Sequence, residues 1–317
     1  MPAKQGTIRQ LKIPLPAGFK LQSAVCFYGF FVLAPNHWLP DKNTLLRPLR
    51  IGGEIIQTTV TQQRRTLIID LAPAINPADQ DIVYAQVRRM LRLDESFSTW
   101  WDIHPQAKTR RFGPMFRSPT LFEDIIKTFT TCNVTWPNTK RMNELLVKHI
   151  GGGAFPTPEQ LAAVTEGELK AMAKVGYRAQ RMIKLAEDTL SGTLNLHTLE
   201  YGDLPPDELF KQLRSIHGLG PYGASNLCQL LGSYQRIPID TETHRHFCQK
   251  MNLKRAKDSK QIKKLDAKIE KHYARWAPYQ FLAYWFDLWL GYEDHLDKPS
   301  EDWAHEETSV FTASEMK

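Results

Sequence analysis

The feature that most constrains the fold is the segment 213–247, LRSIHGLGPYGASNLCQLLGSYQRIPIDTETHRHF. An apolar turn containing Gly218 and Gly220 opens a short apolar helix, and a loop then leads to Asp240 at the start of another helix. Glycines spaced G-x-G at a helix N-terminus let backbone N–H groups approach a phosphate, because no Cβ is in the way. The segment predicts a helical hairpin followed by one carboxylate, although a plain helix–turn–helix corner would give a similar local pattern.

The rest of the chain changes character once along its length. Residues 7–75 contain β-branched and aromatic runs broken by Gly, Pro and Asn, and they predict strands with a hairpin turn at Gly52-Gly53. From Asp79 onward the apolar spacing is helical, with Thr157 as an N-cap and Pro158 at the first helical position. We therefore expect an α+β protein with a β-rich N-terminal domain over 1–80, a helical core over 81–292 and an acidic, flexible tail over 293–317.

Composition narrows the functional classes only a little. The net charge of +7 favours a polyanionic partner. The four cysteines are far apart, so neither a zinc site nor an iron–sulfur cluster is expected. No apolar run is long enough to span a bilayer, and we see no signal peptide, so we expect neither membrane insertion nor secretion. The lack of acidic residues before Asp41 leaves an organelle transit segment as an alternative.

Four motifs resemble the helix-hairpin-helix DNA glycosylases over roughly residues 80–292. SIHGLGPYGAS resembles the hairpin of that superfamily, and PIDTETHR resembles its P-x-D-T-x-x-x-R loop and helix. VGYRA at 175–179 resembles its G-Y/L-R-A turn, and RWAPYQFLAYWF at 275–286 resembles a late helix with Trp276, Pro278, Tyr279 and Ala283 at the shared positions. The β-rich start is similar to the subgroup that holds the 3-methyladenine and 8-oxoguanine glycosylases.

This resemblance implies roles for particular residues. The core would be a mostly α-helical glycosylase core with two helical subdomains flanking an active-site cleft. Asp240 would be the catalytic carboxylate, supported by Thr241 and Arg245 on the helix that follows. Asp240 could also simply cap that helix, and the two roles are compatible. The hairpin that grips DNA phosphates would comprise Ile216, His217, Gly218, Leu219, Gly220, Tyr222, Gly223 and Ala224.

Departures from the family pattern bear on the reaction. His217 replaces the usual proline and Gly223 the usual threonine. Bifunctional members place a lysine two residues after the second hairpin glycine, where it forms a Schiff base with the sugar. Here that position is Tyr222. The resemblance therefore implies a monofunctional enzyme that leaves an abasic site, and the missing cysteines after Asp240 imply no iron–sulfur cluster.

The sequence indicates the substrate less directly than it indicates the reaction. An extruded base is held between aromatic faces, and Tyr222, Trp285 and Trp289 are candidates for that pocket, although the tryptophans could equally be core. Asn133 lies where related enzymes carry the residue that fills the gap in the duplex, or it could only turn its loop. Tyr222 favours an alkylated purine, as in the alkyl-purine enzymes, whereas Asn133 favours 8-oxoguanine.

We therefore expect a monomeric DNA glycosylase of base excision repair that acts on damaged double-stranded DNA. Its compartment would be the cytoplasm or nucleoid of a bacterium, or the nucleus of a eukaryote. It would need no cofactor and no metal held by side chains, although hairpin carbonyls could hold Na⁺ or K⁺. The alternatives are an 8-oxoguanine-type enzyme, with or without lyase activity, and a non-catalytic DNA-binding protein on the same scaffold. The lysine-rich segment 253–273 is either a solvated helix face or a contact to the DNA backbone.

Overall fold

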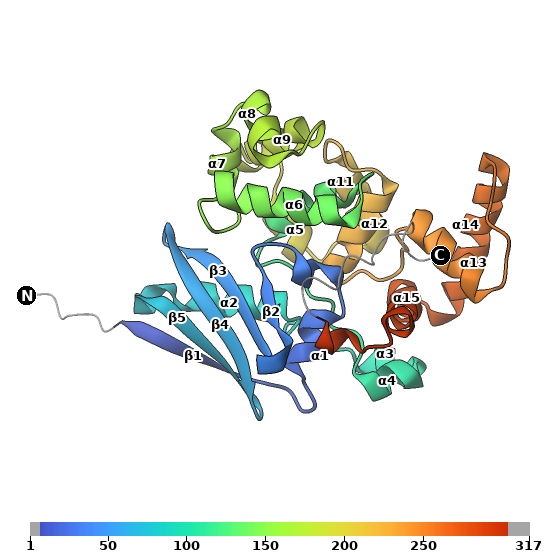
Figure 1. Cartoon of the computed structure of the whole chain (residues 1–317), viewed down its shortest axis with the longest axis horizontal. Coiled ribbons are helices and arrows are strands. Elements are labelled where there is room, and N and C mark those ends of the chain that lie inside the picture. Colours follow the sequence, from blue (N-terminus) through green and yellow to red (C-terminus); the bar gives the residue numbers. More distant parts are fainter. Residues whose placement is uncertain (1–6, 304–317) are drawn as a thin grey trace, which may run out of the picture. The chain divides into compact units, whose positions relative to one another are not determined.

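A computed structural model describes residues 7–303, and their contacts divide into two compact units (Figure 1). Of the described residues, the first unit comprises 7–96, 114–194 and 300–303, and the second comprises 97–113 and 195–299. Strands precede helices along the chain, so the protein is α+β, as the sequence predicts. No helix between residues 7 and 303 is long and apolar enough to cross a membrane.

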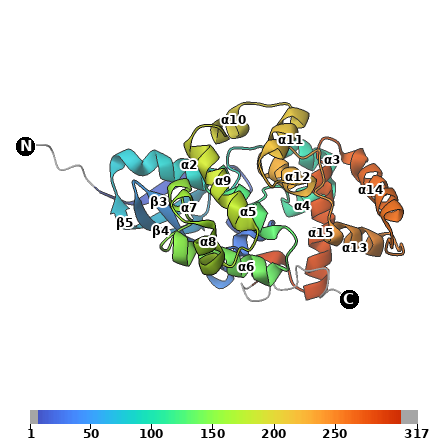
Figure 2. The ribbon, with the colours of Figure 1, turned by 90° about the horizontal axis from the view of Figure 1, so that it is seen from above.

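The first unit is built on a five-stranded antiparallel sheet with the order β1-β5-β4-β3-β2. The strands are β1 (Ile8–Pro14), β2 (His37–Leu39), β3 (Thr44–Ile51), β4 (Glu54–Gln63) and β5 (Thr66–Ile75). Ile51 pairs with Glu54 across the predicted turn at Gly52-Gly53, whose glycines both have positive φ. Helix α2 (Gln80–Met90) contacts β1 and β3, and it lies along one face of the sheet in both views (Figures 1 and 2).

Helices complete the first unit. They are α1 (Leu21–Cys26), α5 (Leu121–Thr131), α6 (Trp136–Leu145), α7 (Pro158–Ala162), α8 (Glu166–Ala173) and α9 (Arg178–Leu190). Short helical turns are η1 (Gly29–Val32), η2 (Pro40–Lys42), η3 (Pro77–Asp79), η4 (Leu146–Ile150) and η6 (Ser300–Asp302). Thr157 caps α7 through a capping box with Gln160, and Pro158 is its first residue, which confirms the predicted start.

A buried ion network joins the sheet of the first unit to α5. Arg47 of β3 contacts Glu123 of α5 at 2.6 Å, and Lys127 contacts the same carboxylate at 2.8 Å. All three side chains are almost fully buried. Burial alone would raise the pKa of Glu123, but Arg47 and Lys127 lower it below its ordinary value. The one carboxylate is therefore shared by two buried cations.

The second unit is entirely helical among its described residues. Its helices are α3 (Ser98–Ile103), α4 (Pro105–Arg110), α10 (Leu196–Tyr201), α11 (Pro206–Ser215), α12 (Pro221–Leu230), α13 (Thr241–Lys250), α14 (Ser259–Tyr273) and α15 (Gln280–Leu296), with a short turn η5 (Ala274–Trp276). Helices α13, α14 and α15 contact one another, and α11 contacts α12 (Figure 2). Aromatic residues of α15 fill much of the core of this unit.

Two local predictions are wrong. Residues 27–33 were expected to form a strand, but they form a turn and η1, because the run is buried on every side and has no alternation to favour a strand. Residues 293–303, which were expected to belong to a flexible tail, are helical or packed. Helix α15 continues to Leu296, where Glu293 accepts a hydrogen bond from Arg110 at 2.8 Å, and Trp303 is fully buried. Residues 304–317 of that segment lie outside the described residues.

Candidate active site

The hairpin of the second unit has the predicted local structure. Helix α11 ends at Ser215, residues 216–220 turn, and α12 begins at Pro221. Gly218 adopts φ +87°, a left-handed conformation that glycine takes without strain. Gly220 is the N-cap of α12, and a Cβ there would meet only the tip of Arg214, at 4.0 Å. The turn therefore leads directly into the N-terminus of α12, the end of a helix that carries partial positive charge.

Asp240 caps α13 through one of its two carboxylate oxygens. Its Oδ1 accepts hydrogen bonds from the backbone N–H of Thr243 at 2.8 Å and from the Thr243 hydroxyl at 2.9 Å. The Thr243 hydroxyl also contacts the Tyr284 hydroxyl at 2.9 Å. Threonine has a single hydroxyl proton to donate. The two contacts are therefore both satisfied when the Tyr284 hydroxyl donates to Thr243 and the Thr243 hydroxyl donates to Asp240. The capping geometry thus fixes the orientation of the carboxylate and leaves Oδ2 for other partners.

The surroundings of Asp240 make its carboxyl more basic than usual. Burial raises the pKa of Asp240 above its ordinary value, and the hydrogen bonds from Thr243 partly oppose the rise. Burial also raises the pKa of Tyr284 well above its ordinary value, and Asp240 and Tyr222 add to that rise. The Tyr284 phenol therefore lies within electrostatic reach of both the carboxylate and the hairpin tyrosine.

Arg245 belongs to a second network on α13. Its guanidinium donates to Glu242 at 2.9 Å and to Gln249 at 2.7 Å, and the Tyr292 hydroxyl donates to Glu242 at 3.0 Å. Arg245 is thus paired on its own helix, one turn beyond the Asp240 cap. Thr241 is the exposed first residue of α13.

The aromatic candidates for a base pocket differ in exposure. Tyr222 and Trp285 are half-buried, whereas Trp289 is only 1% exposed. Trp285 stacks on Trp289, with ring centroids 5.5 Å apart, and on Phe281, at 5.6 Å. Of the two tryptophans, Trp285 therefore has the more accessible surface, and their role in base binding stays a prediction.

The loop with Asn133 belongs to the first unit and is held by Arg178. Asn133 is exposed and has φ +52°. The Arg178 guanidinium donates to the carbonyls of Phe129 at 3.0 Å, of Asn133 at 3.3 Å and of Cys132. Arg178 lies in the GYRA turn, so two motifs that are 45 residues apart meet here. This anchoring fixes the base of the loop and leaves the Asn133 side chain at the surface.

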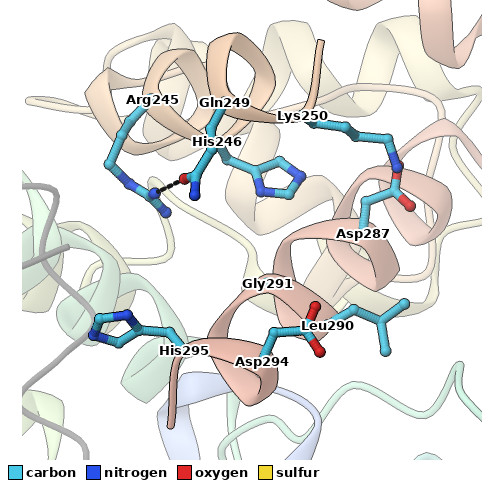
Figure 3. A pocket seen from close by; sticks show the side chains of 9 residues that line it. All are labelled: Arg245, His246, Gln249, Lys250, Asp287, Leu290, Gly291, Asp294 and His295. Atoms are coloured by element: carbon cyan, nitrogen blue, oxygen red, sulfur yellow. Dashed lines mark hydrogen bonds and ion pairs between the residues drawn. The ribbon is translucent and has the colours of Figure 1, made fainter. Parts of the chain in front are cut away.

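A cavity of 490 Å³ lies between α13 and α15, all of it within the second unit (Figure 3). It is lined by Arg245, His246, Gln249, Lys250, Asp287, Leu290, Gly291, Asp294 and His295. Lys250 and Asp287 form an ion pair at 2.8 Å. The His246 ring is buried, and its Nε2 has no hydrogen-bond partner among the described residues. Asp240 does not line this cavity, so it is separate from the candidate catalytic carboxylate.

Protein stability should fall at mildly acidic pH because of His246. Burial lowers the pKa of His246 to about 4, with Asp287 opposing and Lys250 and Arg245 adding to the shift, whereas an unfolded histidine titrates near pH 6.5. The unfolded chain therefore binds a proton first as the pH falls from about 6.5 to 4, and stability is lost in that window. His246→Gln should remove about 2 kcal/mol of the stability loss between pH 7.5 and pH 5, measured by chemical denaturation. The matched change at exposed His197 should not alter the pH dependence, and an equal effect in both variants would exclude the role of burial.

The second unit brings together most of the residues expected from the sequence. The hairpin, Asp240, Thr241, Arg245, Tyr222 and both tryptophans lie within it, whereas Asn133 lies in the first unit. The sequence interpretation missed Thr243, Glu242, Tyr284 and Tyr292. A capping-box spacing, Asp240 followed three residues later by Thr243, was a usable signal for the first of these. No local sequence signal pointed to Tyr284 or Tyr292, because their hydroxyls reach α13 only through the packing of α15 against it.

Comparison with solved structures gives matches over most of the chain. The 3-methyladenine DNA glycosylase from Archaeoglobus fulgidus matches with a TM-score of 0.67 and 16% identity, over 91% of this chain and 99% of that one. MBOgg1, solved with a low-affinity DNA ligand, matches with a TM-score of 0.61 and 17% identity, over 92% and 98%. The Clostridium acetobutylicum 8-oxoguanine glycosylase/lyase, solved with DNA containing cytosine opposite 8-oxoguanine, matches with a TM-score of 0.57 and 17% identity, over 86% and 93%.

Comparison of the sequence finds no match, whereas comparison of the structure does. No family model matches the chain, and no curated protein matches it. At 16–17% identity the structural matches establish the fold and leave the substrate open. Over most of its length, the chain shares its fold with solved 3-methyladenine and 8-oxoguanine DNA glycosylases.

Proposed function

We propose that this chain is a DNA glycosylase of base excision repair that hydrolyses the N-glycosidic bond of a damaged purine in duplex DNA and leaves an abasic site. The observation that carries the proposal is the half-buried Asp240 at the N-cap of α13, in the same helical unit as a glycine hairpin that presents a helix N-terminus. The shared glycosylase fold supports this assignment.

The chemistry follows from the geometry of the carboxylate. As the C1′–N bond breaks, positive charge develops on the sugar, and the electron pair leaves with the base. A carboxylate beside the sugar stabilises that charge and can take a proton from the attacking water. Oδ1 of Asp240 is already held by Thr243, so Oδ2 is the oxygen that we assign to the water and the sugar.

We also propose that the enzyme has no lyase step at the hairpin. A Schiff base needs an amine, and Tyr222 stands where bifunctional relatives carry the lysine. An aromatic side chain there suits stacking against an alkylated purine, and Trp285 offers a second partly exposed ring. An 8-oxoguanine substrate is the second candidate, favoured by the surface position of Asn133.

The test is excision on end-labelled duplexes that each carry one lesion: a stable 3-methyladenine analogue, hypoxanthine, 1,N6-ethenoadenine, 8-oxoguanine or uracil. Each duplex is treated with and without hot alkali after reaction. We expect strand breaks at an alkylated or deaminated purine that appear only after alkali. Breaks without alkali would contradict the monofunctional assignment, and no excision of any lesion with DNA still bound would favour a non-catalytic DNA-binding protein.

The pH dependence of excision should depend on Thr243. The wild-type rate should fall on the acid side at a pH above the ordinary Asp value, because the reaction needs the ionised carboxylate and burial raises the pKa of Asp240. Thr243→Val removes the hydroxyl that donates to Oδ1, so the pKa of Asp240 should rise further and the acid limb should move to higher pH. Single-turnover rates at saturating enzyme between pH 4 and 8 measure the shift.

A matched control separates this effect from the loss of a helix cap. Thr165 caps α8 of the first unit through the same kind of capping box. Thr165→Val should remove a capping-box hydroxyl and leave the acid limb in place. If both variants shift the limb equally, Thr243 does not act through Asp240.

A further inference from the structure

Helix α14 carries a row of exposed lysines on one side. Lys260, Lys264, Lys268 and Lys271 are all exposed, and their spacing places them along a single stripe of the helix, which we call the lysine stripe. The row covers 11 residue steps, or about 16 Å at a rise of about 1.5 Å per residue. Cations in a row of this length have the form of a contact for a linear polyanion.

The opposite side of α14 fixes the helix to the rest of the second unit. The residues buried on that side are Leu265, Ile269 and Tyr273. Phe247 of α13 packs edge-on against His272, with ring centroids 5.4 Å apart. The stripe is therefore held on the outside of a packed helix.

A polar contact places α14 beside the start of α13. His244 Nε2 lies 2.6 Å from Asp266 Oδ1. His244 is only four residues, about 6 Å of helix rise, beyond Asp240. The middle of α14 is thus joined to the first turns of the helix that Asp240 caps.

The charge of this region is not balanced locally. Residues 254–275 contain nine basic and three acidic residues, in a chain of net charge +7. Asp258 caps α14 by accepting from the Gln261 N–H at 2.8 Å, and Asp266 faces His244. Across residues 7–303, no carboxylate oxygen lies within 4.0 Å of an ammonium group of the lysine stripe. These lysines repel one another, and a polyanion would relieve that repulsion.

We propose that the lysine stripe is a second, sequence-independent contact for the phosphate backbone of duplex DNA, in addition to the hairpin. This rests on the proposed function only in taking duplex DNA as the ligand. At about 3.4 Å of rise per phosphate on one strand, a 16 Å row faces about five phosphates. Flexible lysine ammonium groups act as point charges, which suits a contact that must slide over any sequence.

The test uses the full chain with four lysines neutralised together: Lys260→Gln, Lys264→Gln, Lys268→Gln and Lys271→Gln. Glutamine keeps helix propensity close to that of lysine, so α14 should remain folded, which circular dichroism checks. Binding to an undamaged 25-base-pair duplex is measured between 50 and 200 mM salt. Each phosphate contact contributes a slope of about −0.9 to log K against log salt, so the slope should become shallower by about 2 to 4.

Two comparison proteins make the result specific. The control has the same loss of charge on the first unit at exposed residues: Arg9→Gln, Lys12→Gln, Lys20→Gln and Lys42→Gln. The slope of the control should stay within one unit of the wild type. Replacing the four stripe lysines by arginine keeps the charge and should restore the wild-type slope.

The outcomes separate this proposal from the proposed function. An equal slope in the stripe variant, the control and the wild type would overturn the DNA contact and would leave the stripe for an acidic protein partner. If the wild type excises no lesion and the stripe variant still loses slope, the glycosylase assignment fails while the DNA contact stands. With enzyme in excess, excision by the stripe variant should match the wild type once the DNA is saturated, because the stripe does not touch Asp240.

Discussion

Asp240→Asn should reduce base excision by about 10²–10⁴-fold while DNA binding is retained, because it removes one negative charge and little else. Asparagine is as good an N-cap as aspartate, so its carbonyl oxygen can still accept from the Thr243 N–H. The variant should therefore fold, and Oδ2 alone changes from a carboxylate oxygen to an amide group. Single-turnover excision of the lesion identified by the panel measures the rate, and titration of the same duplex measures binding.

A matched substitution at another cap tests whether the loss is catalytic. Asp258 caps α14 through the same kind of hydrogen bond, to Gln261. Asp258→Asn should leave the excision rate within about twofold of the wild type. A similar loss of rate at both positions, or near-wild-type excision by Asp240→Asn, would remove Asp240 from the reaction.

Glu123→Gln should destabilise the protein by about 3–5 kcal/mol, the largest effect on stability that we expect from one substitution. The change leaves Arg47 and Lys127 buried without their shared negative charge. Burial already lowers the pKa of Lys127, and Glu123 opposes this, so Lys127 should become easier to deprotonate in the variant. Equilibrium denaturation by urea measures the difference in unfolding free energy.

A surface pair gives the control for this prediction. Glu166 and Lys170 of α8 form an ion pair at 2.5 Å, with both side chains nearly half exposed. Glu166→Gln should cost no more than about 0.5 kcal/mol, because solvent screens the pair. If the two variants lose equal stability, the buried network does not stabilise the first unit in the way described above.

Local signals in the sequence were sufficient wherever one short segment decides the structure. The turn at Gly218 and Gly220 needs a residue that tolerates positive φ, and the cap at Asp240 needs a short acceptor before a helix. The order of strands before helices followed from periodicity alone. The hairpin and the start of α13 were therefore predictable in shape, whereas their roles in the reaction stay predictions.

Contacts between distant segments were not predictable. The apolar run 27–33 has no alternation, and packing on all sides decides whether such a run is strand or helical turn. Tyr284 contacts Thr243 across 41 residues of sequence, and Tyr292 contacts Glu242 across 50. The sequence near Asp240 therefore does not predict either contact. Glu293 looked like the start of a polar tail, but Arg110 partners it from 183 residues away.

The ion network at Glu123 has a consequence for modularity. Helix α5 is fixed to the sheet through Arg47, and Asn133 lies two residues after the end of α5. The strand-rich start of the chain therefore supports that loop through α5. Deleting it, or exchanging it for N-terminal strands that lack Arg47, would remove one of the two cations that hold Glu123, leave Lys127 as its only ion-pair partner in this network, and weaken the support of the loop. A chimera of this kind must carry Arg47 and Glu123 together.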